Sequence, residues 1–203
     1  MGRKTGIVFV VLGMVLLCGA LCLHLNNGNE ETHAQLVAQQ VIPQIVENLP
    51  ETPDQKALVE RLTPIEFLEP EAFEMTEVVI DGYAYIGYIS IPLLELELPV
   101  MSGWDYTRLK ISPCRYTGSI NGEDLVIMAH NYTTHFGGLS KLQIGDQVVF
   151  TDMDGIVTSY EVVGRDVLAP NAVEEVTSGE FDLTLFTCTY GGKSRVTVYC
   201  NEI

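Results

Sequence analysis

One stretch near the C-terminal end decides the fold: Leu183-Thr-Leu-Phe-Thr-Cys188-Thr-Tyr-Gly-Gly-Lys-Ser-Arg195-Val-Thr-Val-Tyr-Cys200. It reads as two β-strands joined at residues 191–192, a Gly-Gly pair that is favoured in two-residue hairpin loops because both positions adopt positive φ angles. With that loop, the register places Cys188 directly opposite Arg195. Directly opposite residues share one face of a sheet, with Cβ atoms about 4.5–5.5 Å apart.

This pairing sets a permanent cation beside a thiol. A neighbouring positive charge favours the thiolate, which is the nucleophilic form of cysteine, and lowers the pKa of the thiol. A thiolate that attacks a carbonyl also needs a proton donor for the leaving group, and histidine is the usual one. His130 ends an apolar run and His135 follows in the next loop or helix start. We favour His130, because a strand end holds a side chain on a rigid scaffold.

Other readings of the cysteine stay open at this point. Free cysteine is among the most buried residue types, so Cys188 could be a structural thiol. It could instead form a disulfide with Cys114 or Cys200. These three are the cysteines outside the N-terminal apolar run, and an odd number leaves at least one thiol free.

Residues 77–203 form the predicted globular domain, and their sequence pattern is typical of an all-β fold. Short runs rich in Val, Ile, Leu, Tyr and Thr alternate with turn residues every 8–12 positions, as in a sandwich or barrel. One short helix is expected at His135–Leu142. The predicted strands are Tyr83–Ile91, Leu96–Val100, Asp124–Ala129, Gln147–Thr151, Ile156–Val163, Leu183–Thr189 and Arg195–Cys200.

The N-terminal part of the chain reads as a membrane anchor. Residues 1–5 carry Arg3 and Lys4, and residues 6–25 are an uncharged run about as long as a membrane-spanning helix. The basic flank predicts a cytoplasmic N-terminus and an external domain. A cleaved signal peptide is the rival reading, but its apolar core is shorter.

Residues 26–76 are polar and acidic, and they are expected to form an extracellular stalk. Apolar residues recur at helical spacing between Leu36 and Leu49, although Pro43 interrupts them. A second short helix is expected from Asp54 to Leu62. The stalk either contributes a helix packed on the domain or is a partly disordered linker.

Charge and motif spacing exclude several functions. All 27 acidic residues and nine of the 11 basic residues follow residue 25. Binding to nucleic acid needs clusters of Lys and Arg, so nucleic acid is excluded as a partner. The run Asp152-Met-Asp-Gly155 is similar to the start of an EF-hand calcium loop, but position 12 of that loop would be Val163 instead of Glu. We assign no metal and no cofactor.

The sequence resembles the sortase family. Thr184-Leu-Phe-Thr-Cys188 is preceded by Leu183 and fits the signature TLxTC, and Arg195 follows at the start of the next strand as the family's arginine does. Val126-Ile-Met-Ala-His130-Asn131 looks like the stretch around the sortase histidine, with Ala129 where many sortases have Gly. The likeness covers residues 83–200 and implies a closed eight-stranded β-barrel.

The resemblance implies a cysteine transpeptidase with Cys188 as nucleophile, His130 as proton donor and Arg195 as the residue that positions substrate and stabilises the oxyanion. Thr187 and Asn131, their neighbours in the two motifs, are expected to contact substrate. The implied substrates are surface proteins with a C-terminal, LPxTG-like sorting motif. The implied acceptor is an amine of a peptidoglycan cross-bridge or of a pilin lysine.

Two competing functions remain to be weighed. Another cell-wall cysteine enzyme would carry a different signature, such as Ser-His-Gly-Cys-x-Arg for an L,D-transpeptidase, or an early cysteine on a helix for a papain-like peptidase. A non-enzymatic β-domain that binds proteins at the cell surface would have Cys188 buried or disulfide-bonded. An exposed thiol with Arg195 beside it would argue against that reading.

Overall fold

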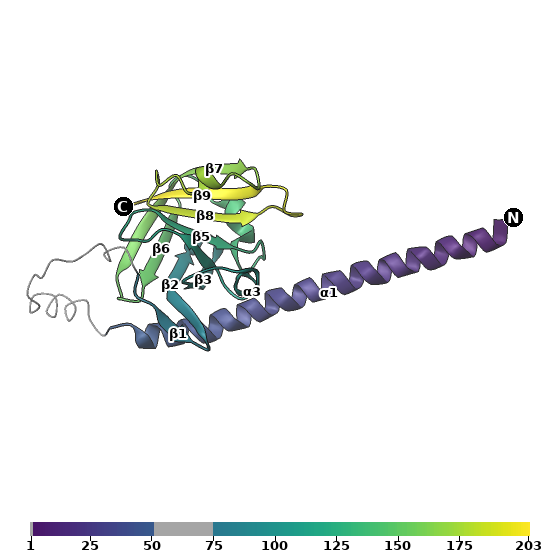
Figure 1. Ribbon diagram of the computed structural model, residues 1–203, viewed down its shortest axis with the longest axis horizontal. Coiled ribbons are helices and arrows are strands. Elements are labelled where there is room, and N and C mark those ends of the chain that lie inside the picture. The colour runs from purple at the N-terminus through teal and green to yellow at the C-terminus, as the bar shows by residue number, and fades with distance from the viewer. Residues whose placement is uncertain (1, 51–74) are drawn as a thin grey trace, which may run out of the picture.

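The computed structural model describes residues 2–50 and 75–203. A closed β-barrel forms most of the second range, and one long helix, α1 (Gly2–Asn48), runs along the barrel and projects far beyond it (Figure 1). The helix predicted at Asp54–Leu62 lies outside the described residues. Nine strands make up the sheet: β1 (Val78–Ile80), β2 (Tyr83–Ile91), β3 (Leu96–Met101), β4 (Cys114–Thr117), β5 (Leu125–Ala129), β6 (Gln147–Asp152), β7 (Val157–Leu168), β8 (Leu183–Cys188) and β9 (Arg195–Glu202).

Eight of these strands close into a ring, as the family resemblance implied. The order is β2-β3-β4-β5-β8-β9-β7-β6, and β6 pairs back onto β2, while β1 only extends the sheet at β2. Closure leaves no free sheet edge within the ring. The closing seam requires a glycine, because a Cβ on Gly87 would lie 2.0 Å from the Thr151 carbonyl oxygen.

Two of the strand pairs are parallel. β3 pairs with β4, and the whole length of β5 pairs with residues 183–187 of β8, which positions the site described below. All other neighbours in the ring are antiparallel. Short helices occupy the connections: η1 (Pro92–Leu94), α3 (Tyr106–Leu109), η2 (Phe136–Lys141) and α4 (Val173–Val176).

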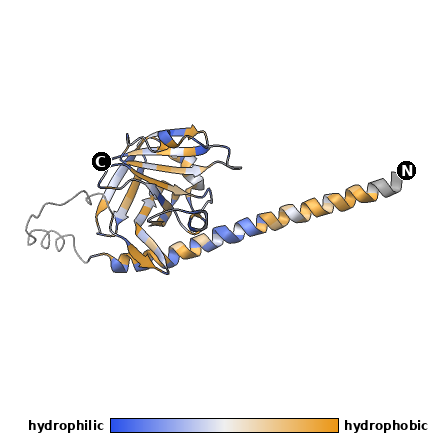
Figure 2. Cartoon of the chain, in the orientation of Figure 1, coloured by the Kyte–Doolittle hydropathy of each residue, from blue (hydrophilic) through white to orange (hydrophobic). Residues whose placement is uncertain are grey.

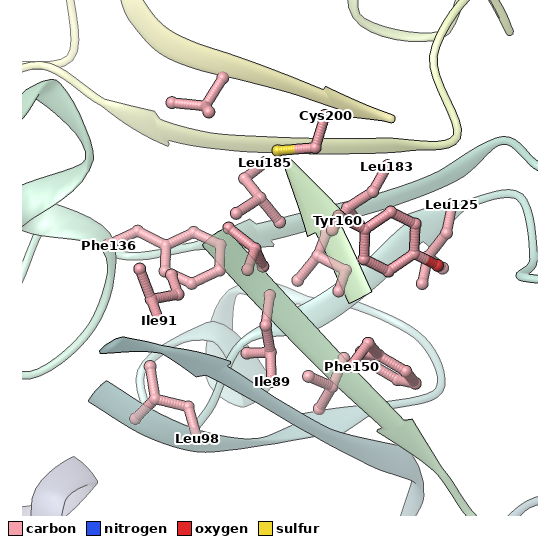
Figure 3. Close-up of a cluster of buried hydrophobic side chains, with 14 of the residues drawn as sticks. Ile89, Ile91, Leu98, Leu125, Phe136, Phe150, Tyr160, Leu183, Leu185 and Cys200 are labelled. Carbon is pink, nitrogen blue, oxygen red and sulfur yellow. The ribbon is translucent and has the colours of Figure 1, made fainter. Parts of the chain in front are cut away.

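The interior of the barrel is filled by one side-chain cluster from almost every strand (Figure 3). Ile89 and Ile91 from β2, Phe150 from β6 and Tyr160 from β7 point inward with almost no exposed surface. Phe136 from η2 covers one end of this core. Burying large aliphatic and aromatic side chains of this kind contributes about 1.5–3 kcal/mol each, which makes the barrel a rigid scaffold for its rim.

All seven strands predicted from short runs of Val, Ile, Leu, Tyr and Thr between turn residues are present, but β1 and β4 were missed. β1 has only three residues, and β4 follows Pro113 with a mixed burial pattern, so neither gives a clear period-two signal. β7 continues five residues beyond its predicted end, past a bulge between Val162 and Gly164. The predicted helix at 135–142 is the shorter 3₁₀ helix η2.

Helix α1 differs from the sequence prediction in being continuous through Pro43. A proline inside a helix removes one hydrogen bond and costs about 3 kcal/mol. Tertiary packing offsets that cost, because the face carrying Ala34, Ala38, Val41 and Ile45 is buried against the domain. Residues 26–48 are therefore a packed helix.

The N-terminal half of α1 is different in character. Its large hydrophobic side chains between Ile7 and Leu25 are exposed, and the helix is long and apolar enough to cross a membrane. Figure 2 shows the change from this hydrophobic half to a hydrophilic segment where the helix reaches the domain.

Candidate active site

The strand order places the three predicted catalytic residues in one row. β8 lies between β5 and β9 (Figure 1). Cys188 at the end of β8 pairs with Arg195 at the start of β9, which confirms the predicted register. On the other side, Ala129 of β5 pairs with Thr187 in parallel register, so His130 follows β5 level with Cys188. Neighbouring strands lie about 4.8 Å apart, which puts the thiol between an imidazole and a guanidinium.

Cys188 is the accessible thiol among residues 75–203. Its side chain is partly exposed and forms no disulfide, whereas Cys114 and Cys200 are buried and free. Burial raises the pKa of each of these two thiols to about 12, so both stay protonated and unreactive. The disulfide reading and the buried-thiol reading of Cys188 both disagree with this arrangement.

Arg195 is held by the loop between the two strands. Its Nη1 atom donates to the carbonyl oxygens of Gly192 and Ser194, at 3.3 Å each. The ion pairs of the described residues involve other cations, which leaves the charge of Arg195 without a carboxylate there. A partly buried, loop-anchored guanidinium of this kind is suited to bind an oxygen of a ligand.

The hairpin loop itself is longer than the predicted two residues. The ladder ends at Cys188 and Arg195, and beyond it the amide of Thr189 bonds to the Ser194 carbonyl at 2.9 Å. A turn then closes with the Gly192 amide donating to the Thr189 carbonyl at 2.8 Å. The two glycines still take positive φ angles, 83° and 70°. The register was correct because the extra loop residues are added in equal number on both strands.

Thr187 fixes the position of the histidine strand. Its buried hydroxyl donates to the Ala129 carbonyl at 2.8 Å, across the β5–β8 boundary and one residue before both His130 and Cys188. Thr187 also lines the cavity described below. Asn131, the other residue expected to contact substrate, is half-buried and does not line that cavity. A substrate contact of either residue stays a prediction.

His130 is partly buried beside an aromatic ring. The imidazole stacks on Tyr132, with ring centroids 4.8 Å apart and planes 19° apart. Burial lowers the pKa of His130, the Glu30 carboxylate opposes that shift, and the Lys110 ammonium adds to it. The ring is therefore mainly neutral at neutral pH and able to accept a proton.

His135, the alternative histidine, has a different environment. Its ring is completely buried, and neither nitrogen has a hydrogen-bond partner among the described residues. Burial lowers the pKa of His135 to about 4, so the ring stays neutral at any pH near 7. It does not line the cavity that His130 lines. This supports the choice of His130 made from the sequence.

The row of three residues faces a cavity of about 190 Å³. One wall is aromatic: Trp104 stacks on Tyr116 at 5.7 Å, and Tyr116 meets Phe186 edge to face at 5.4 Å. The β7–β8 connection adds Pro170, Val173 and neighbouring apolar residues to the lining. No periodic pattern in the sequence marks these lining residues, because they lie in connections that are brought together only when the barrel closes.

Comparison with known proteins shows the family to which this chain belongs. A family model described as the sortase domain matches residues 89–203, more than half of the chain. The chain belongs to the sortase family. The match begins inside β2 and includes every strand that carries the row of three residues, so the sortase domain contains the whole candidate site. It does not include α1.

Individual sortases are similar at moderate identity. Sortase A from Bacillus anthracis is 28% identical over 126 residues, which cover 59% of this chain and 60% of that protein. The chain thus matches about three fifths of the length of this relative. Among solved structures, sortase C from Streptococcus pneumoniae has a TM-score of 0.60 at 26% identity, covering 81% of this chain and 96% of that one. Sortase C1 from Streptococcus suis has a TM-score of 0.51 at 29% identity, covering 59% and 73%.

Proposed function

We propose that this sortase is a cysteine transpeptidase in which Cys188, His130 and Arg195 act as nucleophile, proton carrier and oxyanion-binding residue. The observation that carries the proposal is the row itself. One accessible thiol lies between a partly buried imidazole and a loop-held guanidinium, at the rim of an apolar cavity.

The first half of the reaction is acylation. His130 accepts the Cys188 proton, and the sulfur attacks the carbonyl carbon of the scissile peptide bond. The resulting tetrahedral oxyanion lies within reach of the Arg195 guanidinium, which stabilises its charge. His130 then donates the proton to the departing amine, the C–N bond breaks, and a thioester joins the substrate to Cys188.

The second half reverses these roles with a new amine. The incoming amine attacks the thioester carbonyl while His130 takes its proton. The C–S bond breaks, the thiolate recovers the proton from His130, and the product with its new amide bond is released. Side chains alone supply the nucleophile, the acid–base group and the oxyanion donor, so we assign no metal or cofactor to these steps.

The cavity supports a peptide with an aliphatic anchor as the substrate. Its walls are apolar and aromatic apart from the reacting row, and a few convergent polar groups in an apolar pocket are typical of a specific ligand site. We assign the C-terminal, LPxTG-like sorting motif of surface proteins to it. The acceptor is a peptidoglycan cross-bridge amine or a pilin lysine, and the similar sortase C from Streptococcus pneumoniae is known for its pilin substrate specificity.

The apolar half of α1 supports a membrane location. We assign it as a single span with Arg3 and Lys4 on the cytoplasmic side and the barrel outside the cell. Surface proteins in transit across the membrane and lipid-linked amine acceptors would both meet the enzyme there.

The test uses the full chain in lipid nanodiscs with a library of LPxTG-like peptides and a small amine. Mass spectrometry should find a thioester on Cys188 and amine-exchanged product, and both should vanish in Cys188→Ala. Absence of any adduct, together with a Cys188 thiol that does not react with alkylating reagents, would overturn the proposal in favour of a binding domain.

A further inference from the structure

The hydrophilic segment of α1 reaches the active site from outside the matched sortase domain. Glu30 and Glu31 lie five and six residues beyond the last residue of the apolar run. Both carboxylates bond to residues about 80 to 100 positions later in the chain. Contacts this specific between the anchor helix and the barrel rim call for a role beyond attachment.

Glu30 joins the two segments that flank the cavity. Its Oε1 atom pairs with the Lys110 ammonium at 2.7 Å, directly after α3, whose Leu109 and Tyr106 line the cavity. Its Oε2 atom accepts the Tyr132 hydroxyl at 3.0 Å. The hydrogen bonds to these partners lower the pKa of Glu30, so the carboxylate stays charged at neutral pH.

Tyr132 links Glu30 to the reacting imidazole. The tyrosine ring is 5% exposed, its hydroxyl is occupied by Glu30, and its face stacks on His130. A side chain held at its far end and packed along its length has little rotamer freedom. It therefore restricts the plane and position of the imidazole stacked on it.

Glu31 holds the backbone of the same loop. One oxygen of its carboxylate accepts the amides of Thr133 at 2.7 Å and Thr134 at 3.3 Å, together with the Thr133 hydroxyl. Charge-assisted bonds to backbone amides are roughly twice as strong as neutral ones. The loop that begins at His130 is thus fixed by the helix at successive residues.

We propose that Glu30, Glu31 and Tyr132 are positioning residues through which α1 holds His130 in place and brings a negative charge near it. The proposal rests on the catalytic role proposed for His130 and extends it to a helix that the sortase match does not include. Activity then depends on the packed part of α1 as well as on the barrel.

The charge of Glu30 and that of Lys110 act on His130 in opposite directions. The carboxylate favours the imidazolium and the ammonium disfavours it. A purely structural role would make loss of either partner of the pair act alike, whereas an electrostatic role predicts opposite effects. Among the described residues, the other titratable groups near His130 are its stacked partner Tyr132, its neighbour His135 and Glu31 beside that loop. Tyr106, Tyr116, Cys188 and Arg195 line the same cavity.

The experiment follows the His130 titration by NMR in full chain labelled at histidine in nanodiscs, beside the pH profile of kcat/KM. Glu30→Gln should lower the pKa of His130, and Lys110→Met should raise it. Glu47 is an exposed glutamate on the same helix, and Glu47→Gln should leave both the pKa of His130 and the pH profile of kcat/KM unchanged. Tyr132→Phe keeps the stacked ring but frees it from Glu30, and should reduce kcat/KM about tenfold, within the ~10²-fold that a 1 Å misplacement can cause.

The outcomes separate this proposal from the proposed reaction. Opposite shifts of the His130 titration support the charge that the proposal places near His130 even if no peptide is turned over, because NMR needs no substrate. The loss of kcat/KM in Tyr132→Phe supports the positioning of the imidazole. Shifts of the same sign, or none beyond those of Glu47→Gln, would overturn it even in a fully active transpeptidase.

Discussion

The two residues proposed to act with Cys188 lie at different distances from it in the chain: Arg195 is seven residues away and His130 is 58 residues away. The structure fixes them by different means. Arg195 is fixed by a single hairpin whose ladder runs from Leu183 to Cys188. His130 is fixed by parallel pairing of β5 with β8, by the Thr187 hydroxyl, and by a helix about 100 residues earlier. The hairpin side depends on local geometry, whereas the histidine side depends on closure of the whole barrel.

This difference teaches where each half of the site is vulnerable. The hairpin side is a short antiparallel ladder, so it should tolerate changes elsewhere in the molecule. The histidine side is assembled from β5, β8 and α1 and contains the buried, neutral His135, so it should respond to pH and to remote substitutions. The predictions below test that contrast, from the largest expected effect to the smallest.

Removing Cys188, the nucleophile with which both His130 and Arg195 are proposed to act, should abolish activity. Cys188→Ala is expected to lower acyl transfer by about 10⁴-fold or more, because residues that act as a unit fail together. Its unfolding curve should match the parent, since the side chain is partly exposed. Steady-state transpeptidation and thermal melting check this. Cys200→Ala should stay active, and an inactive but folded Cys200→Ala would mean that the nucleophile is wrongly assigned.

Breaking only the hairpin side should leave the thiol in place. Arg195→Ala is expected to reduce kcat/KM by about 10²–10³-fold, the usual effect of losing one oxyanion donor. Alkylation of Cys188 should persist, as labelling followed by mass spectrometry can show. Arg165→Ala, on β7 outside the cavity, is the matched control and should retain activity. An Arg195→Ala enzyme with near-normal turnover would remove Arg195 from the mechanism.

Acid should destabilise the histidine side selectively. His135 titrates near 4 in the folded protein and near 6.5 when unfolded, so the unfolded chain binds more protons between these values. Stability is therefore full above about pH 6.5 and falls by about 3 kcal/mol as the pH approaches 4. Denaturant unfolding at pH 7 and pH 5 measures this. His135→Leu should flatten the pH dependence, and an unchanged slope in that variant would contradict the assignment.

Weakening the side-chain contact between β8 and β5 should have the smallest effect. Thr187→Val removes the donor to the buried Ala129 carbonyl, and an unsatisfied buried acceptor costs about 1–3 kcal/mol. The free energy of unfolding should fall by that amount, with roughly a tenfold loss of kcat/KM from misalignment. Thr197→Val is the control, because the buried Thr197 hydroxyl has no partner among the described residues. Equal losses in both variants would show that the bond to Ala129 has no special role.

The contrast also explains what the sequence could reveal. The Cys188–Arg195 register followed from one Gly-Gly pair, and seven strands followed from short runs of β-forming residues between turn residues. The pairing of β5 with β8 could not be predicted, because parallel partners far apart in the chain leave no local mark. His130 was chosen over His135 from its place at a strand end, and its geometry relative to Cys188 came only with the barrel.

Two further features had no signal that sequence reasoning could use. Pro43 suggested a broken helix, and only the buried face around Val41 and Ile45 shows why the helix continues. Glu30 and Glu31 entered the sequence interpretation only as part of the acidic stretch that follows the apolar run. Their partners Lys110, Tyr132 and Thr133 become neighbours of the helix only after the domain has folded.

Because α1 is one continuous helix, it also sets the height of the active site above the bilayer. A helix rises 1.5 Å per residue, so the five steps from Leu25 to Glu30 span only about 8 Å. On the proposed topology, with α1 along the membrane normal, the loop after His130 lies about one nanometre beyond the end of the apolar run. A substrate would then have to present its scissile bond at that height. Each residue inserted between Leu25 and Glu30 would raise the barrel by 1.5 Å and turn its cavity by about 100° about the membrane normal.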